Sequence, residues 1–200
     1  MCVRGIVRDD RPVCGALRTE SGAWYKTLMA RLIYSVAASL DAFIAGPQGD
    51  YDWIPMDPDI DFVEMYRSFS RIVMGRVSWE VYQASGGSPG PQLPITVCSR
   101  SLPEGTRDGA TFVHDAAARV AELKQRDDKP IWLWGGGVLF RELAREGLVD
   151  GVQVAVVPIL LGGGLPLYPP GGPRLPLRLT KQQHYPKSGI VVLDYDVVRG

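Results

Sequence analysis

The segment from Ile131 to Leu148 limits what this chain can fold into, because a strand, a glycine turn and a helix follow one another in it without a break. Its first four residues, Ile-Trp-Leu-Trp, are typical of a buried strand. The turn consists of Gly135, Gly136 and Gly137. The next apolar residues repeat at helical spacing, which predicts a helix; they are Val138, Leu139, Leu143 and Leu148.

The same segment has the features of an anion site. Free backbone N–H groups converge at a helix start, the helix dipole favours negative charge there, and glycine lets a phosphate approach the backbone closely. A nucleotide or dinucleotide is therefore a candidate ligand. A plain tight turn explains three glycines equally well, so this segment alone does not decide.

Composition narrows the class of partner. The chain has 200 residues, with 22 basic and 22 acidic side chains. Zero net charge and the lack of a basic cluster argue against nucleic-acid binding. The most apolar run, 152–167, is broken by Pro158 and Pro166, so no membrane span is expected.

Neither metal binding nor secretion is expected. Three cysteines without motif spacing (Cys2, Cys14 and Cys98) and two distant histidines (His114 and His184) suggest no zinc site. The N-terminus lacks the apolar core of a signal peptide, which favours a cytoplasmic protein.

The chain divides into two parts of unequal size. Residues 1–29 show no sustained period and are expected to form a poorly ordered extension, with residues 30–200 as one domain. The alternative is an arm that packs on a partner through Trp24 and Tyr25.

Strands and helices alternate from residue 31 onward. Strands are expected at 31–38, 71–74, 95–98, 111–113, 131–134 and 151–157, and helices at 59–69, 76–83, 115–126 and 138–146. Alternating apolar residues from Leu175 to Val197, around a turn at Pro186–Gly189, predict a final hairpin. The expected fold is a three-layer α/β/α domain with a mixed, mostly parallel sheet and a C-terminal antiparallel hairpin.

Two further turns follow predicted strands. Gly75, Arg76 and Ser78 lie where a strand meets a helix, and Ser99 and Arg100 follow the next strand. Arginine and hydroxyl groups there suit phosphate, and an arginine favours the 2′-phosphate of NADP over a free ribose hydroxyl. The alternatives are that Ser78 caps its helix, that Arg76 is solvated and that Ser99-Arg100 is an ordinary surface turn.

In their order along the chain, these segments resemble the dihydrofolate-reductase-like superfamily. The resemblance is greatest to the branch that holds the reductase domain of bacterial riboflavin biosynthesis and its small stand-alone relatives. The matching segments are Ala38–Gly46, Met74–Glu80, Val97–Arg100, Trp134–Gly137 and Val156–Leu167.

The resemblance implies NADPH as the cofactor. It assigns the 2′-phosphate and pyrophosphate to Gly75, Arg76, Ser78, Ser99 and Arg100, and more of the pyrophosphate to Gly135, Gly136, Gly137, Val138 and Leu139. It places Ala38, Ile44 and Gly46 near the nicotinamide. It also implies a small-molecule substrate and a homodimer, for which 152–161 and the hairpin are the expected surfaces.

The catalytic acid is open between two positions. Asp41 lies in a family-like Ser-Leu-Asp segment, where it either faces the substrate or stabilises a turn. Asp61, or Asp59, is a counterpart of the proton-relay acid of dihydrofolate reductases, although Asp57, Asp59 and Asp61 also suit helix capping. Trp53 is either a wall of the substrate pocket or core.

Two departures from the family pattern bear on the substrate. The usual Ser-Leu-Asp-Gly reads Ser-Leu-Asp-Ala here, ending at Ala42. No residues are found that would grip the ribose phosphate of the riboflavin substrate.

The expected function is an NADPH-dependent reductase that passes a hydride to a C=N or C=O of a pyrimidine- or pterin-like small molecule. The alternative is a nucleotide-binding or sensing module of the same fold without turnover. A flavin in the same cleft is a third option.

Overall fold

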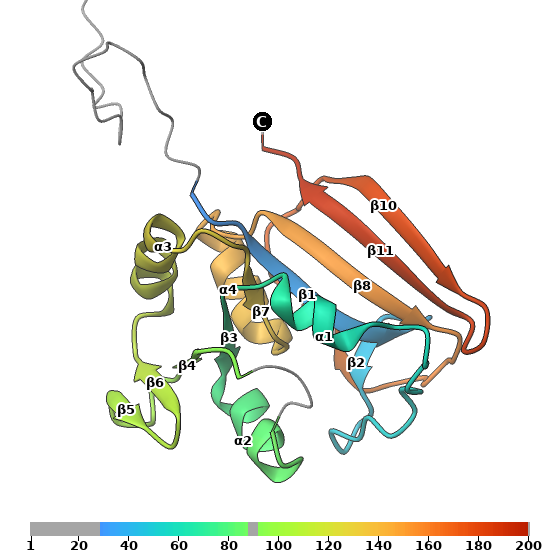
Figure 1. Ribbon diagram of the computed structural model, residues 1–200, viewed down its shortest axis with the longest axis horizontal. Helices are drawn as coiled ribbons and strands as arrows, with labels where there is room; N and C mark the ends of the chain where they lie inside the picture. The colour runs from blue at the N-terminus through green and yellow to red at the C-terminus, as the bar shows by residue number, and fades with distance from the viewer. Residues whose placement is uncertain (1–28, 88–91, 200) are drawn as a thin grey trace, which may run out of the picture.

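The computed structural model describes residues 29–87 and 92–199 (Figure 1). The expected extension, 1–29, lies outside the described residues except for Met29. The strands are β1 (Leu32–Ser39), β2 (Phe43–Ala45), β3 (Arg71–Gly75), β4 (Ile95–Cys98), β5 (Gly105–Arg107), β6 (Ala110–Val113), β7 (Ile131–Leu133), β8 (Gly151–Val157), β9 (Leu165–Pro166), β10 (Leu177–Tyr185) and β11 (Ile190–Val197). The helices are α1 (Phe62–Arg67), α2 (Arg76–Ala84), α3 (Ala116–Arg126) and α4 (Gly137–Arg145).

Nine of these strands form one sheet in the order β10-β11-β8-β1-β7-β3-β4-β6-β5. All the pairings from β8 across to β6 are parallel, as the strand–helix alternation predicts. The C-terminal hairpin joins β8 in antiparallel fashion and forms one end of the sheet. The predicted mixed sheet is therefore confirmed.

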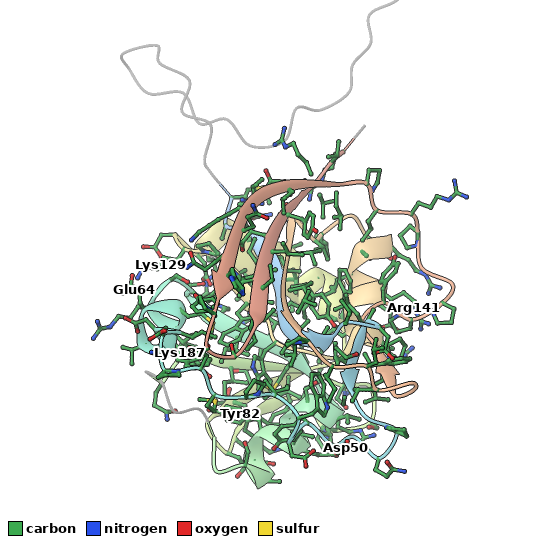
Figure 2. All side chains as sticks on the ribbon, turned by 90° about the vertical axis from the view of Figure 1, so that its right-hand side faces the viewer. Asp50, Glu64, Tyr82, Lys129, Arg141 and Lys187 are labelled. Carbon is green, nitrogen blue, oxygen red and sulfur yellow. The ribbon has the colours of Figure 1, made fainter. Side chains whose placement is uncertain are left out.

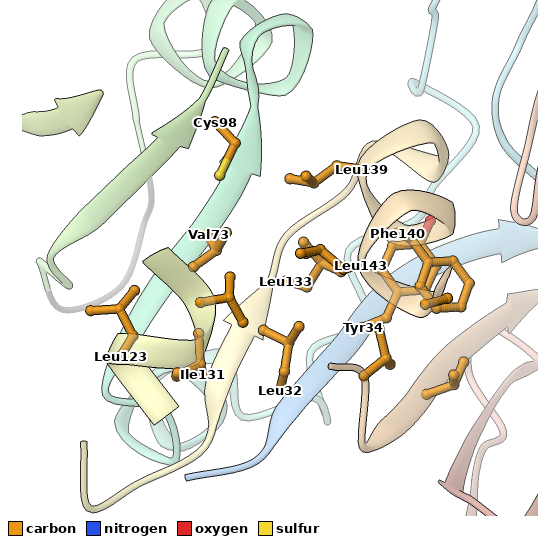
Figure 3. Packing of buried hydrophobic residues seen from close by; sticks show 14 of the residues in the cluster. Leu32, Tyr34, Val73, Cys98, Leu123, Ile131, Leu133, Leu139, Phe140 and Leu143 are labelled. Carbon is orange, nitrogen blue, oxygen red and sulfur yellow. The ribbon is translucent and has the colours of Figure 1, made fainter. Parts of the chain in front are cut away.

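Helices cover both faces of the sheet. On one face Leu32 and Tyr34 of β1 pack against α4, and the Tyr34 and Phe140 rings stack with centroids 4.0 Å apart (Figure 3). On the other face the Trp132 ring packs against the rings of Tyr66 and Phe69, with centroids 5.1 and 5.2 Å away. These two apolar clusters give the three layers that the sequence predicts.

The expected strands and helices differ from the observed ones mainly where elements are short. The sequence does not reveal β2, β5 or β9, which have two or three residues each and so show no period. The expected helix 59–69 begins only at Phe62, because the Asp61 carboxylate caps it there by accepting a hydrogen bond from the Glu64 N–H at 2.8 Å. It ends at Arg67, with Ser68 as its C-cap.

Asp57 fastens the loop before α1 to the turn of the C-terminal hairpin. Its side chain is buried and accepts hydrogen bonds from the backbone N–H groups of Asp59, at 2.8 Å, and Ser188, at 3.0 Å. Lys187, labelled in Figure 2, adds an ion pair with Asp59 at 2.7 Å. Asp57 and Asp59 therefore precede the helix instead of lying in its first turn, and they hold two distant segments together.

The hydrogen bonds of Asp57 should make part of the free energy of unfolding depend on pH. Hydrogen bonds from Ser188, and then from the Asp59 N–H, hold the pKa of Asp57 below its ordinary value. A lowered pKa in the folded state gives stability that is complete above the unfolded-state pKa and is lost as the pH falls through the folded-state pKa. We expect Asp57→Asn to lose less stability than the wild type between pH 6 and pH 2 in urea unfolding. Asp52→Asn, a change at an exposed neighbour, should follow the wild type, and equal losses in all three proteins would contradict this account.

Candidate active site

The three predicted phosphate-binding turns lie side by side. β7, β3 and β4 are neighbours in the sheet, with Val73 paired to Leu133 and Gly75 paired to Cys98. Their carboxyl ends therefore bring Gly135–Gly137, Gly75–Ser78 and Ser99–Arg100 to one edge. α2 packs on one face of the sheet and α4 on the other, and a crevice opens between adjacent strands whose helices diverge in this way.

A cleft of about 2160 Å³ occupies this edge and extends along the face of the sheet toward α1 and the hairpin. It brings together most of the predicted site residues, namely Ile44, Asp61, Gly75, Arg76, Ser78, Ser99, Arg100, Gly135, Gly136, Gly137, Val138 and Leu139. Four predicted residues lie outside its lining: Ala38, Asp41, Gly46 and Trp53.

The glycine turn before α4 has the shape of an anion cradle. Gly135 and Gly136 have φ angles of 72° and 85°, a region that favours glycine. Gly136 is the N-cap of α4, and no side chain caps the helix there. The hydroxyl of Ser78 lies 3.4 Å from where a Cβ atom would stand at either glycine, so the two glycine turns face each other across the crevice.

The start of α2 is similarly uncapped. Its N-cap is Gly75, with no side-chain hydrogen bond, so the alternative that Ser78 caps this helix is wrong. A Cβ atom at Gly75 would meet nothing within 4 Å. Two helix starts with uncapped N–H groups thus line one side of the cleft, where an anion would be favoured.

Both predicted arginines are near the mouth of the cleft. Arg76 pairs with Glu80 on its own helix, and Arg100 reaches Glu142 of α4 at 3.4 Å. Because the Arg100 side chain is 83 % exposed, this pair contributes little and can be exchanged for a stronger anion. The Ser99 hydroxyl accepts the Leu102 N–H at 3.1 Å and so shapes this turn.

The opposite side of the cleft is formed by α1 and the hairpin. Asp61 lines it, and within the described chain one of its oxygens, Oδ1, takes part in the helix cap. Capping and a role at the site are therefore compatible for this acid. Phe62, Met65 and Trp132 supply apolar wall beside it.

Asp41 is held by the loop after β8. Its carboxylate accepts hydrogen bonds from the Ser39 hydroxyl (2.6 Å), the Leu161 N–H (3.1 Å) and the Gly162 N–H (2.7 Å). The Ser39 hydroxyl, with those two N–H groups, lowers the pKa of Asp41. These contacts match the turn-stabilising alternative. Ala42, which stands where the family usually has glycine, adopts a φ of 64°, so the turn keeps a glycine-like conformation.

The other three residues outside the lining have local surroundings of their own. Ala38 is 1 % exposed and packs in the core on the α4 face, which keeps its side chain from the cleft. A Cβ atom at Gly46 would meet the Asp50 carboxylate at 2.3 Å, so the glycine there serves the turn. Trp53 donates its indole N–H to the Asp50 carbonyl at 3.2 Å in the same loop.

One wall of the cleft is not evident from the sequence. β9 pairs with β2, and the Pro166 carbonyl and the Pro169 ring pack closely over Gly137. The loop 162–174, whose role the sequence leaves open, thus contributes wall beside the α4 cradle. The pairing of β9 with β2 could not be predicted, because a strand of two residues shows no period in the sequence.

Metal and membrane features are absent from the ranges 29–87 and 92–199. Those ranges hold no group of three or more His, Cys, Asp or Glu side chains suited to a metal ion. They also hold no helix long and apolar enough to cross a membrane.

Comparison with known proteins identifies the family. The model of the RibD C-terminal domain matches residues 30–191. The chain belongs to the RibD C-terminal domain family. This agrees with the resemblance drawn from the sequence motifs.

Relatives of similar length occur in Bacillus subtilis (strain 168). The uncharacterized protein YyaP is 32% identical over 178 residues, which cover 82% of this chain and 94% of YyaP. The uncharacterized protein YwjB is 29% identical over 143 residues, with 69% and 82% covered.

Solved structures share the fold. A candidate riboflavin biosynthesis protein from Shewanella sp. PV-4 has a TM-score of 0.72 and 26% identity, over 86% of this chain and all of that one. A Thermotoga maritima diaminohydroxyphosphoribosylaminopyrimidine deaminase/5-amino-6-(5-phosphoribosylamino)uracil reductase has a TM-score of 0.62 and 15% identity, over 85% of this chain and 57% of that one. A pyrimidine reductase-like protein from Corynebacterium diphtheriae has a TM-score of 0.62 and 17% identity, with 86% and 93% covered.

The cradle makes a prediction about two glycines that look alike in the sequence. A methyl group at Gly137 would lie 2.8 Å from the Pro166 carbonyl and the Pro169 ring, so we expect Gly137→Ala to lower the free energy of unfolding by about 1–3 kcal/mol. Gly75→Ala meets open space and should cost less than about 1 kcal/mol. Urea unfolding of both variants measures this, and equal costs would show that the loop does not pack tightly over α4.

Proposed function

We propose that this protein is an NADPH-dependent reductase that passes a hydride to a C=N or C=O bond of a pyrimidine- or pterin-like heterocycle. The observation that carries the proposal is the convergence of two uncapped helix starts, a left-handed glycine turn and two arginines on one side of a single cleft. Membership of the RibD C-terminal domain family supports it.

The residues present fit a dinucleotide phosphate. Gly135 and Gly136 leave an open cradle at the start of α4, and the Ser78 hydroxyl faces it. We assign the pyrophosphate to this cradle, and the 2′-phosphate to Arg76 and Arg100 because a guanidinium binds phosphate through paired hydrogen bonds. When bound, NADPH supplies the hydride.

The protein would supply orientation and a proton route. Ile44 and the apolar wall of α1 would hold the reacting rings together and limit access of water. Of the two predicted acids, Asp61 lines the cleft, whereas Asp41 is engaged by its own loop. We therefore assign the proton route to Oδ2 of Asp61, either directly or through a water molecule.

A cofactor-binding module without turnover is the second candidate. The engagement of Asp41 by the Ser39 hydroxyl and two loop N–H groups favours it. The predicted acids left at the cleft are then Asp61, whose Oδ1 caps α1, and Asp59, which is ion-paired with Lys187. The two candidates differ in turnover and share cofactor binding.

Pairing of two copies through the hairpin remains a proposal. β8 is hydrogen-bonded on both sides, to β1 and β11, so the expected surface 152–161 offers no free strand edge along β8. β10 is the last strand at that end of the sheet and is largely exposed. We infer that β10 is the edge through which a homodimer would form.

The arginine assignment predicts a cofactor-selective loss. We expect Arg76→Ala and Arg100→Ala each to weaken NADPH binding by about tenfold or more and NADH binding by less than about threefold, because the 2′-phosphate is present only in NADPH. Quenching of tryptophan fluorescence measures both, since Trp132 and Trp134 line the cleft. Arg126→Ala, on α3 outside the lining, is the matched control. Equal losses for both nucleotides would make the arginines structural.

The acid assignment predicts a loss of turnover alone. Asparagine caps helices as well as aspartate does, so Asp61→Asn should keep α1 and the NADPH affinity while removing the ionisable group. We expect turnover of a reducible pterin or pyrimidine to fall by about 100-fold or more. Unchanged turnover would remove Asp61 from the mechanism, and absence of turnover in the wild type with NADPH bound would favour the non-catalytic module.

A further inference from the structure

A row of polar side chains crosses four strands beside α1. Ser35 of β1 is paired in register with Gln153 of β8, Gln153 with Asp194 of β11, and Asp194 with Lys181 of β10. All four line the cleft. Because Tyr34 faces the core on the α4 side, its neighbour Ser35 faces the side of α1.

The row is hydrogen-bonded in one direction. A carboxylate only accepts hydrogen bonds, so the Asp194 Oδ1 atom requires the NH₂ end of Gln153, which lies 2.5 Å away. The carbonyl end of Gln153 then faces Ser35, whose hydroxyl must donate to it, at 2.6 Å. Asp194 thus fixes the orientation of Gln153, and Gln153 fixes the proton of Ser35.

The consequence is that Ser35 offers lone pairs, not a proton, to the cleft. Its proton is committed to Gln153, while its oxygen still has capacity to accept. Ser35 is 5 % exposed, so a ligand group that meets it is largely removed from water. A polar ligand group that cannot form a hydrogen bond there loses its contact with water without compensation, which weakens binding.

A large ring lies next to this position. The indole N–H of Trp132 donates to the Ser35 carbonyl at 2.8 Å, and Trp132 itself lines the cleft. Trp132 thus fixes the main chain at Ser35, and both residues stand in the same wall of the cleft.

We propose that Asp194 and Gln153 are positioning residues that set the substrate preference of this cleft. By orienting the Ser35 hydroxyl, they make the site select a heterocycle that presents an N–H donor to Ser35 and reject one that presents a carbonyl oxygen. The proposal rests on the proposed function, since it takes the α1 side of the cleft as the substrate site.

The charges around the row are consistent with this preference. Asp61, Glu64 and Asp194 line this part of the cleft, whereas Lys181 is the one basic side chain among the described residues of α1 and the hairpin that line it. Asp194 lies opposite Lys181 in the sheet. Acceptor groups therefore predominate on this side, which favours ligand groups that donate.

The test uses two ligands with one ring system and opposite exocyclic groups. The full chain is titrated by calorimetry with 2,4-diaminopteridine, which carries two amino groups, and with pteridine-2,4-dione, which carries two carbonyls in their place. We expect the wild type to bind the diamino compound about tenfold or more tightly than the dione.

The variants then separate orientation from structure. In Asp194→Asn the new amide can donate or accept, so Gln153 and Ser35 are free to reverse, and the ratio of the two affinities should fall to about threefold or less. Gln153→Leu breaks the row at its centre and should lower the ratio in the same way. Asp128→Asn, an exposed acid outside the cleft, should keep the wild-type ratio.

The outcomes are distinct from those of the cofactor assignment. An unchanged ratio in the variants that fold, tighter binding of the dione by the wild type, or binding of neither compound would each overturn the proposal. The titrations contain no cofactor, so failure of the wild type to bind NADPH in a separate titration would overturn the proposed reductase and leave the measured preference standing.

Discussion

The position of β7 between β1 and β3 determines where this protein can bind a ligand. β7 follows β1, β3 and β4 in the sequence but lies between β1 and β3 in the sheet. As a result α2, which follows β3, lies on one face, whereas α4, which follows β7, lies on the other. Two helix starts then diverge from adjacent strands, and their free N–H groups border the same crevice.

Local sequence predicted this part of the site well. A strand that runs through glycine into a helix is a continuous signal, so Gly135–Gly137 and Gly75–Ser78 are assigned correctly to strand–helix turns without knowledge of the sheet order. The strand order could not be read in the same way, because it depends on packing between segments far apart in the chain. The resemblance to the family suggested how the segments are arranged. The match of the family model to residues 30–191 confirms that resemblance.

The α1 side of the cleft, which we propose as the substrate site, was less predictable for the same physical reason. Ser35, Gln153 and Asp194 come from three strands, and none stands in a motif; their relation exists only through the sheet register. Asp41 shows the opposite case, since it stands in a family-like motif and the structure gives its carboxylate to the Ser39 hydroxyl and the loop after β8. The motif thus located the turn correctly, but it did not show which groups the Asp41 carboxylate contacts.

The cleft combines two kinds of surface. Backbone N–H groups and arginines border one side, and carboxylates with aromatic and aliphatic walls border the other. Anions are favoured on the first side by the helix dipoles, and N–H donors on the second by the acceptor oxygens. The proposed reductase would use both sides at once, the first for a phosphate-rich cofactor and the second for a planar acceptor.

The most direct test of the account is an NMR titration of the isotope-labelled protein with NADPH, following the backbone amides of all three turns. We predict that the amides of Gly75–Ser78, Ser99–Arg100 and Gly135–Val138 change together and saturate at one NADPH concentration, because one dinucleotide spans them. Changes confined to a single turn, or no changes in any of them, would contradict the central claim that these strand ends form one cofactor site.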